Sequence, residues 1–318
     1  MIQTIPVNEH DRRPSSTVPL KLLPDEGSVG VGPVDVGVHI KRLRDAIAPL
    51  KRVVVAFSAG VDSTVVLKCA RDVLGRDNVL AGTGVSPSLA RRELDSVRDL
   101  ATLLDVPLEL VETSEMDSPN YTANPTNRCY FCKTELYTKL TEVARRRGFH
   151  VLLNGLNLDD TGDHRPGRLA ATEFDVRSPL LEARLTKSDV RAVALKLGLP
   201  NWQKPALACL SSRIPYGTPV TIKSLTQIEK AEAFLYDRAF TNFRVRHHGN
   251  LARIEVNPTD LGRLVVEPLR SELVTYFKNI GYTYVTMDLQ GFRSGSGNEV
   301  LPSRSGSGSG SAQRFGQA

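Results

Sequence analysis

The sequence predicts an α/β protein that combines a doubly wound parallel sheet with a smaller C-terminal α+β domain. Two observations support this fold class. In the first half of the chain, short apolar segments alternate with helical patterns, which is the order of a parallel sheet whose strands are connected by helices. Beyond a loop at residues 200–220, the order changes to helix, two strands, helix and strand. This change predicts a second domain with its own sheet.

The first predicted strand leads directly into a loop and a helix. Residues 53–57 form a short β-branched run, typical of a strand covered on both faces. In the helix that follows, Asp62 and Ser63 are suitable N-caps, Cys69 is expected to be a core thiol, and Gly75 ends the helix. The next elements continue the alternation: strand 79–84, helix 89–104, strand 107–111, helix 135–147 and strand 151–154.

The second half contains a capping signal and the smaller domain. Thr186 and Asp189 are spaced as a capping box, which predicts a helix that stops at Gly198. The smaller domain is expected to contain helix 225–239, strands 243–247 and 252–256, helix 269–280 and strand 282–287. The chain therefore divides into a flexible segment 1–37, a doubly wound domain 38–200, an α+β domain 201–293 and a disordered Ser/Gly tail 294–318.

The composition is typical of a soluble two-domain enzyme. The chain has 318 residues, 41% of them hydrophobic, and no stretch approaches the roughly 18 apolar residues of a membrane span. The first 35 residues lack the apolar region of a signal peptide, so we expect a cytoplasmic protein without a membrane partner. The net charge of +6 is dispersed among acidic residues, which favours anionic small molecules over nucleic acid. Four cysteines suit a reducing compartment.

A small polar loop between the first strand and helix predicts a phosphate site. It consists of Ser58, Ala59, Gly60, Val61, Asp62 and Ser63. Its small residues let backbone N–H groups approach a ligand, and the N-terminus of the next helix adds partial positive charge. The loop is not a Walker A motif, because no Gly-Lys-Ser/Thr tripeptide follows Gly60. The alternative is an ordinary strand-to-helix turn.

Three cysteines are candidates for one metal site. Cys129 and Cys132 have the spacing that lets both thiolates reach one metal, and Cys209 is a third candidate. Three thiolates without an evident fourth ligand suit a [4Fe–4S] cluster with one open iron. The alternatives are a thioredoxin-like redox pair, zinc completed by His164 or His247, or buried thiols.

Two further groups of polar residues follow predicted strands. Asn157, Asp159 and Asp160 lie at a strand end, where such groups can hold a sugar, a magnesium ion and a phosphate; a solvated loop is the alternative. Arg244 and Arg246 alternate on one strand, so both guanidinium groups face the same side and could bind one phosphate. The alternative for this pair is an exposed surface.

Taken together, these segments resemble the LarE family over roughly residues 38–290. The loop at 58–63 is similar to the pyrophosphate loop, usually Ser-Gly-Gly-x-Asp-Ser, of enzymes that split ATP into AMP and pyrophosphate; Ala59 departs from the usual glycine. The segment 208–217, Ala-Cys-Leu-Ser-Ser-Arg-Ile-Pro-Tyr-Gly, is the most specific part of the match. The other matching segments are 128–133, 155–160, 163–167, 178–180, 185–187, 204–205 and 244–249.

The resemblance implies an ATP-dependent sulfur transferase in the synthesis of the nickel-pincer nucleotide cofactor. Such an enzyme adenylates a carboxylate of pyridinium-3,5-dicarboxylate mononucleotide, releases pyrophosphate, and uses sulfur to displace AMP. By resemblance, residues 38–200 would bind ATP, with Asp62 holding Mg²⁺ or the ribose and Ser63 the phosphate, while Asp159 and Asp160 face the nucleotide. The family also suggests a homo-oligomer.

The resemblance assigns the second domain to sulfur transfer and to binding of the acceptor. By resemblance, Arg244, Arg246 and Glu232 would form the pocket for the phosphate of the mononucleotide. In one branch of the family, the cysteine that matches Cys209 gives up its own sulfur. In the other branch, a Cys-x-x-Cys pair joins it to bind a [4Fe–4S] cluster that carries sulfide from a donor. The Cys-x-x-Cys pair of this chain favours the second branch.

Three other functions remain open at the level of the sequence. A tRNA-thiolating enzyme with a similar loop would carry a basic RNA-binding module, and none is apparent. An ammonia-dependent ligase similar to NAD or GMP synthetases would leave the three cysteines without a role. A non-enzymatic nucleotide-binding module would bind ATP without forming pyrophosphate.

Overall fold

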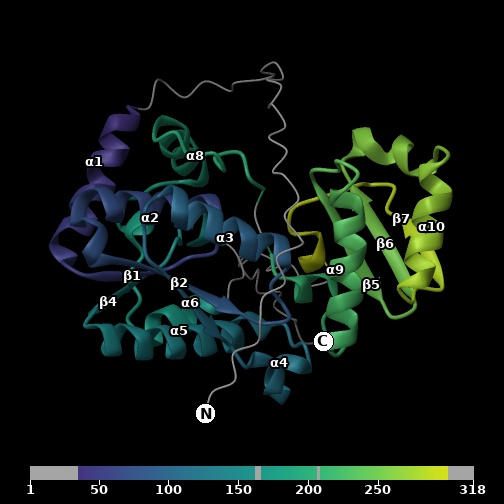
Figure 1. Cartoon of the computed structure of the whole chain (residues 1–318), viewed down its shortest axis with the longest axis horizontal. Coiled ribbons are helices and arrows are strands. Elements are labelled where there is room, and N and C mark those ends of the chain that lie inside the picture. Colours follow the sequence, from purple (N-terminus) through teal and green to yellow (C-terminus); the bar gives the residue numbers. More distant parts are fainter. Residues whose placement is uncertain (1–34, 162–165, 206–207, 300–318) are drawn as a thin grey trace, which may run out of the picture. The chain divides into compact units, whose positions relative to one another are not determined.

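The computed structural model describes residues 35–161, 166–205 and 208–299 (Figure 1). The strands are β1 (Val53–Ala56), β2 (Val79–Val85), β3 (Leu108–Glu112), β4 (Val151–Leu153), β5 (Phe243–His248), β6 (Leu251–Val256) and β7 (Tyr284–Met287). The α-helices are α1 (Val36–Ile47), α2 (Val61–Leu74), α3 (Arg91–Leu103), α4 (Pro119–Thr122), α5 (Arg128–Arg147), α6 (Gly167–Glu173), α7 (Pro179–Glu182), α8 (Lys187–Lys196), α9 (Ile222–Tyr236) and α10 (Leu269–Asn279). Short 3-10 helices include η3 (Glu115–Asp117), η4 (Asp159–Thr161), η5 (Leu210–Arg213) and η7 (Ser296–Asn298).

The first four strands form one parallel sheet in the order β3-β2-β1-β4. The strand order reverses between β1 and β4, since β2 lies on one side of β1 and β4 on the other. Ligands of doubly wound sheets bind at such a switch point, outside the carboxyl ends of the strands. The predicted fold class is confirmed, and the loop that follows β1 lies at the switch point.

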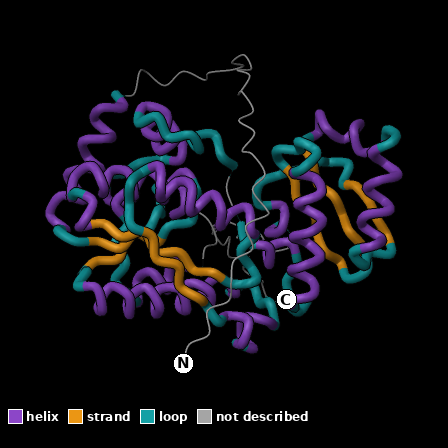
Figure 2. The backbone as a smooth tube through the Cα atoms, in the orientation of Figure 1, coloured by secondary structure: helices purple, strands orange, loops and turns teal. Residues whose placement is uncertain are grey.

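Helices cover both faces of this sheet (Figure 2). Val53 and Val55 belong to a core formed with α1, α2, α3 and α8, whereas Val54 packs on the other side with α5 and α6. Successive residues of a strand point to opposite faces, so this β-branched run contributes to both cores. Because helices cover both faces of the sheet, every residue of β1 is apolar.

The local signals for helix ends are partly confirmed. Thr186 and Asp189 form the predicted capping box of α8. Gly75 follows the last residue of α2 as expected. The N-cap of α2, however, is Gly60, and no side chain caps that helix end. Asp62 and Ser63 lie within the first turn, so predicting either as the N-cap was wrong, because the helix begins earlier than its apolar pattern.

The smaller sheet has the order β5-β6-β7. β5 pairs antiparallel with β6, and β6 pairs parallel with β7. One face of this sheet packs against α9 and α10 through a core that includes Val245, Ile254 and Phe277. The register sets Arg244 opposite Glu255 and Arg246 opposite Arg253 on the other face. The alternation of β5 and β6 therefore separates an apolar face from a charged one.

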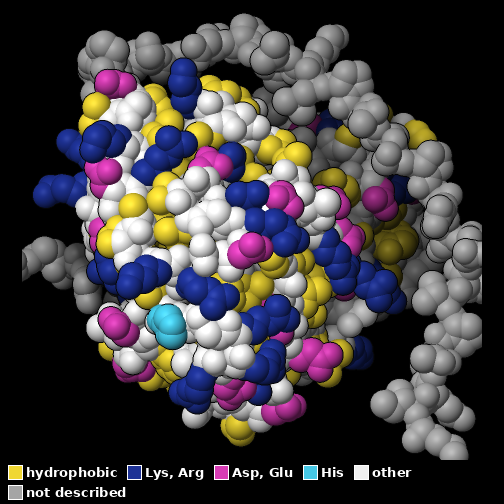
Figure 3. Space-filling view, turned by 60° about the vertical axis from the view of Figure 1, so that its left-hand side comes forward, with side chains coloured by type: hydrophobic (Ala, Val, Ile, Leu, Met, Phe, Trp, Pro, Cys, Tyr) yellow, Lys and Arg dark blue, Asp and Glu magenta, His cyan; other side chains and the backbone are white. Residues whose placement is uncertain are grey.

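Two predicted boundaries fall partly outside the described residues. The predicted flexible segment 1–37 is described only from Asp35, whose side chain caps α1, and the predicted tail only up to residue 299. Within that tail, Ser296 is buried. Among the described residues, no helix is long and apolar enough to cross a membrane. On the face shown in Figure 3, Lys and Arg side chains are interspersed with Asp and Glu, in agreement with the dispersed charge of the sequence.

Candidate functional site

The loop after β1 offers uncapped backbone N–H groups. The N–H groups in the first turn of an α-helix have no acceptor within the helix, and no side chain caps the N-terminus of α2. Gly60 is extended there, with φ −77° and ψ 156°, while Ala59 is left-handed, with φ 55°. These N–H groups, together with the helix dipole, are suited to binding an anion.

Asn201 holds the carbonyl side of the same loop. Its Nδ2 donates to the carbonyl of Ala59 at 3.1 Å and to Thr64 Oγ1 at 2.9 Å. Thr64 in turn donates to the carbonyl of Gly60 at 2.8 Å. Because a peptide's N–H and C=O point in opposite directions, fixing the Ala59 carbonyl also fixes the orientation of the N–H of Gly60.

Asp62 lies among residues from two distant segments. Its Oδ1 accepts a hydrogen bond from Asn157 Nδ2 at 3.2 Å, and its Oδ2 forms an ion pair with Lys187 at the start of α8. Gly155 permits the close approach of the Asn157 loop, because a Cβ on Gly155 would lie 2.8 Å from the backbone nitrogen of Ser63. The structure thus brings the 58–63 loop and the 155–160 loop together.

The two carboxylates of the second loop organise the backbone. Asp160 is buried, and its Oδ2 accepts from the N–H of Asn157 at 3.1 Å. Asp159 Oδ2 accepts from the N–H of Lys187 at 2.8 Å, which links this loop to the first turn of α8. Both carboxylates therefore shape the loop whose Asn157 contacts Asp62.

Cys209 lies in a segment that several residues hold in place. It is the N-cap of η5, and the N–H of Leu210 donates to the carbonyl of Ser88, just beyond β2, at 2.9 Å. Arg128 donates to the carbonyl of Ser211 at 3.1 Å. The cysteine segment is thus connected to the carboxyl end of β2 and to the first turn of α5.

The three candidate thiols influence one another. Burial, the charge of Cys209 and the carboxylate of Glu115 raise the pKa of Cys132 to about 12. The pKa of Cys129 is raised by the protein packed around it and by Cys209, although its side chain still reaches solvent. Cys129 and Cys132 lie in the first turns of α5, and both thiols interact electrostatically with Cys209.

These thiols provide a suitable donor set but not an assembled metal site. In the described part of the chain, no three His, Cys, Asp or Glu side chains form a group that could hold a metal ion. Of the two histidines considered for zinc, His164 lies outside the described residues, and His247 Nδ1 is 3.0 Å from the hydroxyl of Tyr282. Cys69 is fully buried, and burial raises its pKa to about 12, as expected for a core thiol.

Glu232, on α9, pairs with Arg213 in η5 and with Arg92 in α3. The fully buried carboxylate accepts from Arg213 Nε at 2.8 Å and from Arg92 Nη2 at 2.9 Å. It also accepts from the N–H of Val245 at 3.2 Å, on the free edge of β5. Burial tends to raise the pKa of Glu232, but the neighbouring arginines, Arg213 above all, lower it to about 2.

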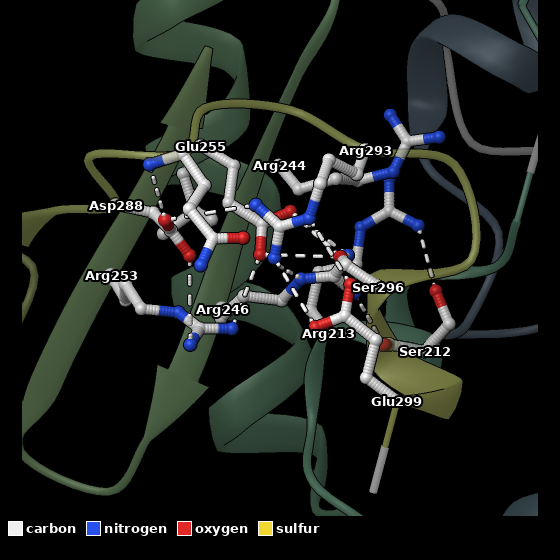
Figure 4. Close-up of polar contacts among 12 residues, drawn as sticks. Ser212, Arg213, Arg244, Arg246, Arg253, Glu255, Asp288, Arg293, Ser296 and Glu299 are labelled. Atoms are coloured by element: carbon white, nitrogen blue, oxygen red, sulfur yellow. Dashed lines mark hydrogen bonds and ion pairs between the residues drawn. The ribbon is translucent and has the colours of Figure 1, made fainter. Parts of the chain in front are cut away.

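Arg246 pairs with a different carboxylate, Glu255 (Figure 4). Arg246 donates from Nε and Nη2 to the two oxygens of Glu255, each at 2.9 Å. Burial, together with the charges of neighbouring arginines, lowers the pKa of Arg244 to about 10, although Glu232 acts in the opposite direction. These arginines are Arg92, Arg213 and Arg246. An anion placed among these guanidinium groups would offset their mutual repulsion.

Comparisons with known proteins give the family. No protein-family model matches the chain. It is 47% identical to an uncharacterized protein of Synechocystis sp. over 82% of this chain and 97% of that protein. It is 40% identical to pyridinium-3,5-bisthiocarboxylic acid mononucleotide synthase of Lactiplantibacillus plantarum over 80% of this chain and 92% of that protein. The chain belongs to the LarE family. It is therefore an enzyme, and the LarE family is one of sulfur transferases in nickel-pincer cofactor biosynthesis.

Membership of the LarE family separates this chain from the tRNA-thiolating, ammonia-using and non-enzymatic alternatives. Reasoning from the sequence assigned no role to Lys187, Arg213, Glu255, Asn201 or Ser296. Lys187 and Arg213 lie within segments that carry the family resemblance, and this was the only signal for them. Their contacts, with Asp62 and Glu232, could not be read from that signal.

Proposed function

We propose that this protein is an ATP-dependent sulfur transferase that converts a carboxylate of pyridinium-3,5-dicarboxylate mononucleotide into a thiocarboxylate. One observation carries the proposal: the uncapped N-terminus of α2, with the carboxylate of Asp62 beside it, lies at the switch point of the parallel sheet. Such a site suits the pyrophosphate of ATP. The named relative from L. plantarum supports the mononucleotide as the acceptor.

Adenylation makes the carboxylate reactive. A carboxylate oxygen attacks the α-phosphorus of ATP, the bond from this phosphorus to the bridging oxygen breaks, and pyrophosphate leaves. The N–H groups of Gly60 and Val61 would stabilise the charge that develops on the pyrophosphate. Hydrosulfide then attacks the acyl carbon and loses its proton, and AMP leaves with the electron pair of the C–O bond.

Asp62 and Asp159 are the residues that would hold a magnesium ion with ATP. Carboxylate and phosphate oxygens are the ligands that Mg²⁺ prefers, and the ion would neutralise phosphate charge. Asp62 already contacts Lys187 and Asn157, so a bound ion would share this carboxylate with them. The ammonium group of Lys187 would then also interact with phosphate oxygens bound beside the loop.

We also propose that Cys129, Cys132 and Cys209 hold a [4Fe–4S] cluster. Three thiols and an open fourth position suit such a cluster, which would supply sulfide from an external donor. The electrostatic interaction of the three thiols supports their convergence. Their side chains would have to turn toward a common point, because no such group is assembled in the described part of the chain. The described cysteines are free thiols, as a reducing cytoplasm would keep them.

The acceptor's phosphate would bind beside Arg244 and Arg246. Burial and, after it, the neighbouring arginines lower the pKa of Arg244, and a phosphate dianion would interact favourably with this partly desolvated guanidinium group. Arg213 connects this region to sulfur transfer, because it donates to Glu232 and also to the carbonyl of Cys209 at 2.9 Å. The side chain of Arg213 thus links the proposed acceptor pocket to the segment that carries Cys209.

The products of ATP cleavage test the proposal. With ATP, Mg²⁺ and pyridinium-3,5-dicarboxylate mononucleotide, we expect AMP and pyrophosphate, measured by chromatography and a pyrophosphate assay. Asp62→Asn should lower the rate of AMP formation at least about 100-fold, the range for removal of one electrostatic stabiliser. Asp45→Asn, in an exposed ion pair on α1, is the control and should keep the rate. Formation of ADP and orthophosphate without AMP would contradict the proposal.

A further inference from the structure

A segment just after β7 crosses the charged face of the smaller sheet. The N–H of Phe292 donates to the carbonyl of Val256, at the end of β6, at 2.7 Å. Gly291 has φ 71°, and a Cβ there would lie 2.8 Å from the same carbonyl. Only glycine fits this close approach without a shift of the backbone. The segment is therefore anchored at the C-terminal end of β6 before it reaches the arginines.

The anchored segment then contacts both arginines of the predicted phosphate pocket. The guanidinium carbon of Arg244 lies 5.0 Å from the centroid of the Phe292 ring, a cation–π contact. Four residues later, Ser296 is buried at the start of η7. Its Oγ lies 2.7 Å from Arg246 Nη2 and 3.3 and 3.4 Å from the two carboxylate oxygens of Glu255 (Figure 4).

Ser296 completes the set of bonds that orients Arg246. The guanidinium donates once from Nε and twice from Nη2, to Glu255 and Ser296, and once from Nη1 to the carbonyl of Ser212 at 3.0 Å. Among the described residues, these bonds use four of its five N–H groups, and the second N–H of Nη1 has no acceptor. The plane of the guanidinium is thereby fixed.

The oxygen of Ser296 plays two roles in this arrangement. It accepts a hydrogen bond from Arg246 and can donate its own proton to Glu255. The neutral hydroxyl therefore bridges the two charged groups without disrupting their ion pair. Glu255 also interacts with a second arginine, because Arg253 Nη2 lies 3.2 Å from Glu255 Oε1. Removing the hydroxyl would leave a buried N–H of Arg246 and an oxygen of Glu255 each short of one partner.

We propose that Phe292 and Ser296 form a wall of the acceptor pocket, and that Ser296 is a positioning residue that directs the remaining Nη1–H of Arg246 toward the phosphate of the acceptor. This inference rests on the proposed function, because it takes the acceptor to be a mononucleotide. It adds the C-terminal segment to a pocket that the sequence confined to β5 and α9. It also predicts an effect on acceptor affinity with no effect on ATP.

Two serine variants test the role of Ser296. In the full-length protein, Ser296→Ala should raise the KM for pyridinium-3,5-dicarboxylate mononucleotide about tenfold, the effect of one charge-assisted hydrogen bond. The kcat for AMP formation and the KM for ATP should not change. Ser294→Ala is the matched control, since this side chain is exposed two residues away, and its constants should equal those of the unmodified protein. Circular dichroism melting of both variants identifies any loss of folding.

Arg246→Ala separates failure of this inference from failure of the proposed function. If Arg246→Ala raises the acceptor KM but Ser296→Ala does not, Ser296 has no positioning role and the proposed function stands. A lower acceptor KM in Ser296→Ala would mean that Ser296 competes with the phosphate, which also overturns the inference. If neither variant changes the acceptor KM while AMP and pyrophosphate still form, the acceptor pocket itself lies elsewhere.

Discussion

Ala59 is the residue of the phosphate loop at which this chain departs from the usual pyrophosphate-loop sequence. Its φ of 55° is in the left-handed region, which costs a residue with a Cβ roughly 1–2 kcal/mol. The methyl group is fully buried in the core beneath α2 and so compensates by about 0.8 kcal/mol. The hydrogen bond from Asn201 to the Ala59 carbonyl further favours the left-handed conformation. Alanine is therefore tolerated here because the methyl group packs and the carbonyl is held.

The balance at Ala59 predicts how two glycine substitutions differ. Ala59→Gly removes the buried methyl group and increases the entropy of the unfolded chain, which together destabilise the protein by about 1.5 kcal/mol. The same substitution relieves the strain of the left-handed backbone. The free energy of unfolding should therefore change by less than about 1 kcal/mol. Ala81→Gly is the matched control, because Ala81 is also fully buried but lies within strand β2 and outside the left-handed region. It should lose about 1.5 kcal/mol in urea unfolding. Equal losses in the two variants would show that Ala59 is not strained.

At the scale of elements, α9 supports the free edge of β5 through one carboxylate. Glu232 accepts the N–H of Val245 on that edge and binds Arg213 from the cysteine segment. An edge strand has unpaired N–H groups that need partners. One buried side chain thus fixes a strand and orients the arginine that contacts Cys209. The site therefore depends on the ionised state of Glu232.

This dependence has a predicted pH range. The pKa of Glu232 is about 2 in the folded protein, below the ordinary 4.5, so its contribution to stability is complete above about pH 4.5 and is lost as the pH falls toward 2. Glu232→Gln should remove this part of the pH dependence. At pH 7 it should also lower the free energy of unfolding by about 3 kcal/mol, because the buried Arg213 loses its partner.

Urea unfolding between pH 2.5 and 7 measures both effects. Glu272→Gln is the control, because Glu272 pairs with Arg238 in a half-exposed ion pair on α10, where such pairs contribute little. Parallel pH curves for the unmodified protein and Glu232→Gln would show that the carboxylate does not carry the acid sensitivity.

At the scale of the whole molecule, the proposed sulfur chemistry would depend on segments that are far apart in the sequence. Cys129 and Cys132 are carried by α5, whereas Cys209 precedes η5. The N–H of Leu210 donates to the carbonyl of Ser88, and Arg128 on α5 donates to the carbonyl of Ser211, so the Cys209 segment is held near α5. The tertiary fold thus brings the third thiol toward the Cys-x-x-Cys pair, and through Arg213 toward the acceptor pocket.

The cysteine variants distinguish two sources of sulfur. If the three thiols bind one cluster, anaerobically reconstituted protein should contain about four irons per chain, and Cys129→Ser should lose both the iron and thiocarboxylate formation. Cys69→Ala, which removes the buried core thiol, should keep its iron. Iron content is measured by a colorimetric assay and the product by mass spectrometry.

In the alternative chemistry, Cys209 gives up its own sulfur. Cys129→Ser would then remain active, and intact-mass spectrometry after one turnover would show the chain lighter by one hydrogen sulfide. That outcome would sink the cluster proposal while leaving adenylation unaffected.

The sequence by itself determined the features that depend on neighbouring residues. The β-branched run of β1 and the capping box at Thr186 are local signals, and the strand and the helix start that they predicted are confirmed. The small loop at 58–63 is also local, and the phosphate site that it predicts stays a prediction. The alternation of Arg244 and Arg246 also predicted that both lie on one face of β5, because side chains alternate along any strand.

Only the tertiary structure decided which charged groups meet. Lys187 reaches Asp62 across 125 positions of the chain, and Arg246 pairs with Glu255 while Glu232 binds Arg213. Alternation gives the face of a residue but not the register of the neighbouring strand, which is set by packing across the sheet. Ser296 lies in a Ser/Gly stretch whose composition indicates disorder, yet it is buried, because Gly291 and Phe292 anchor the chain beside β6. Composition averages over a segment, whereas burial depends on the partners that the fold supplies to each residue.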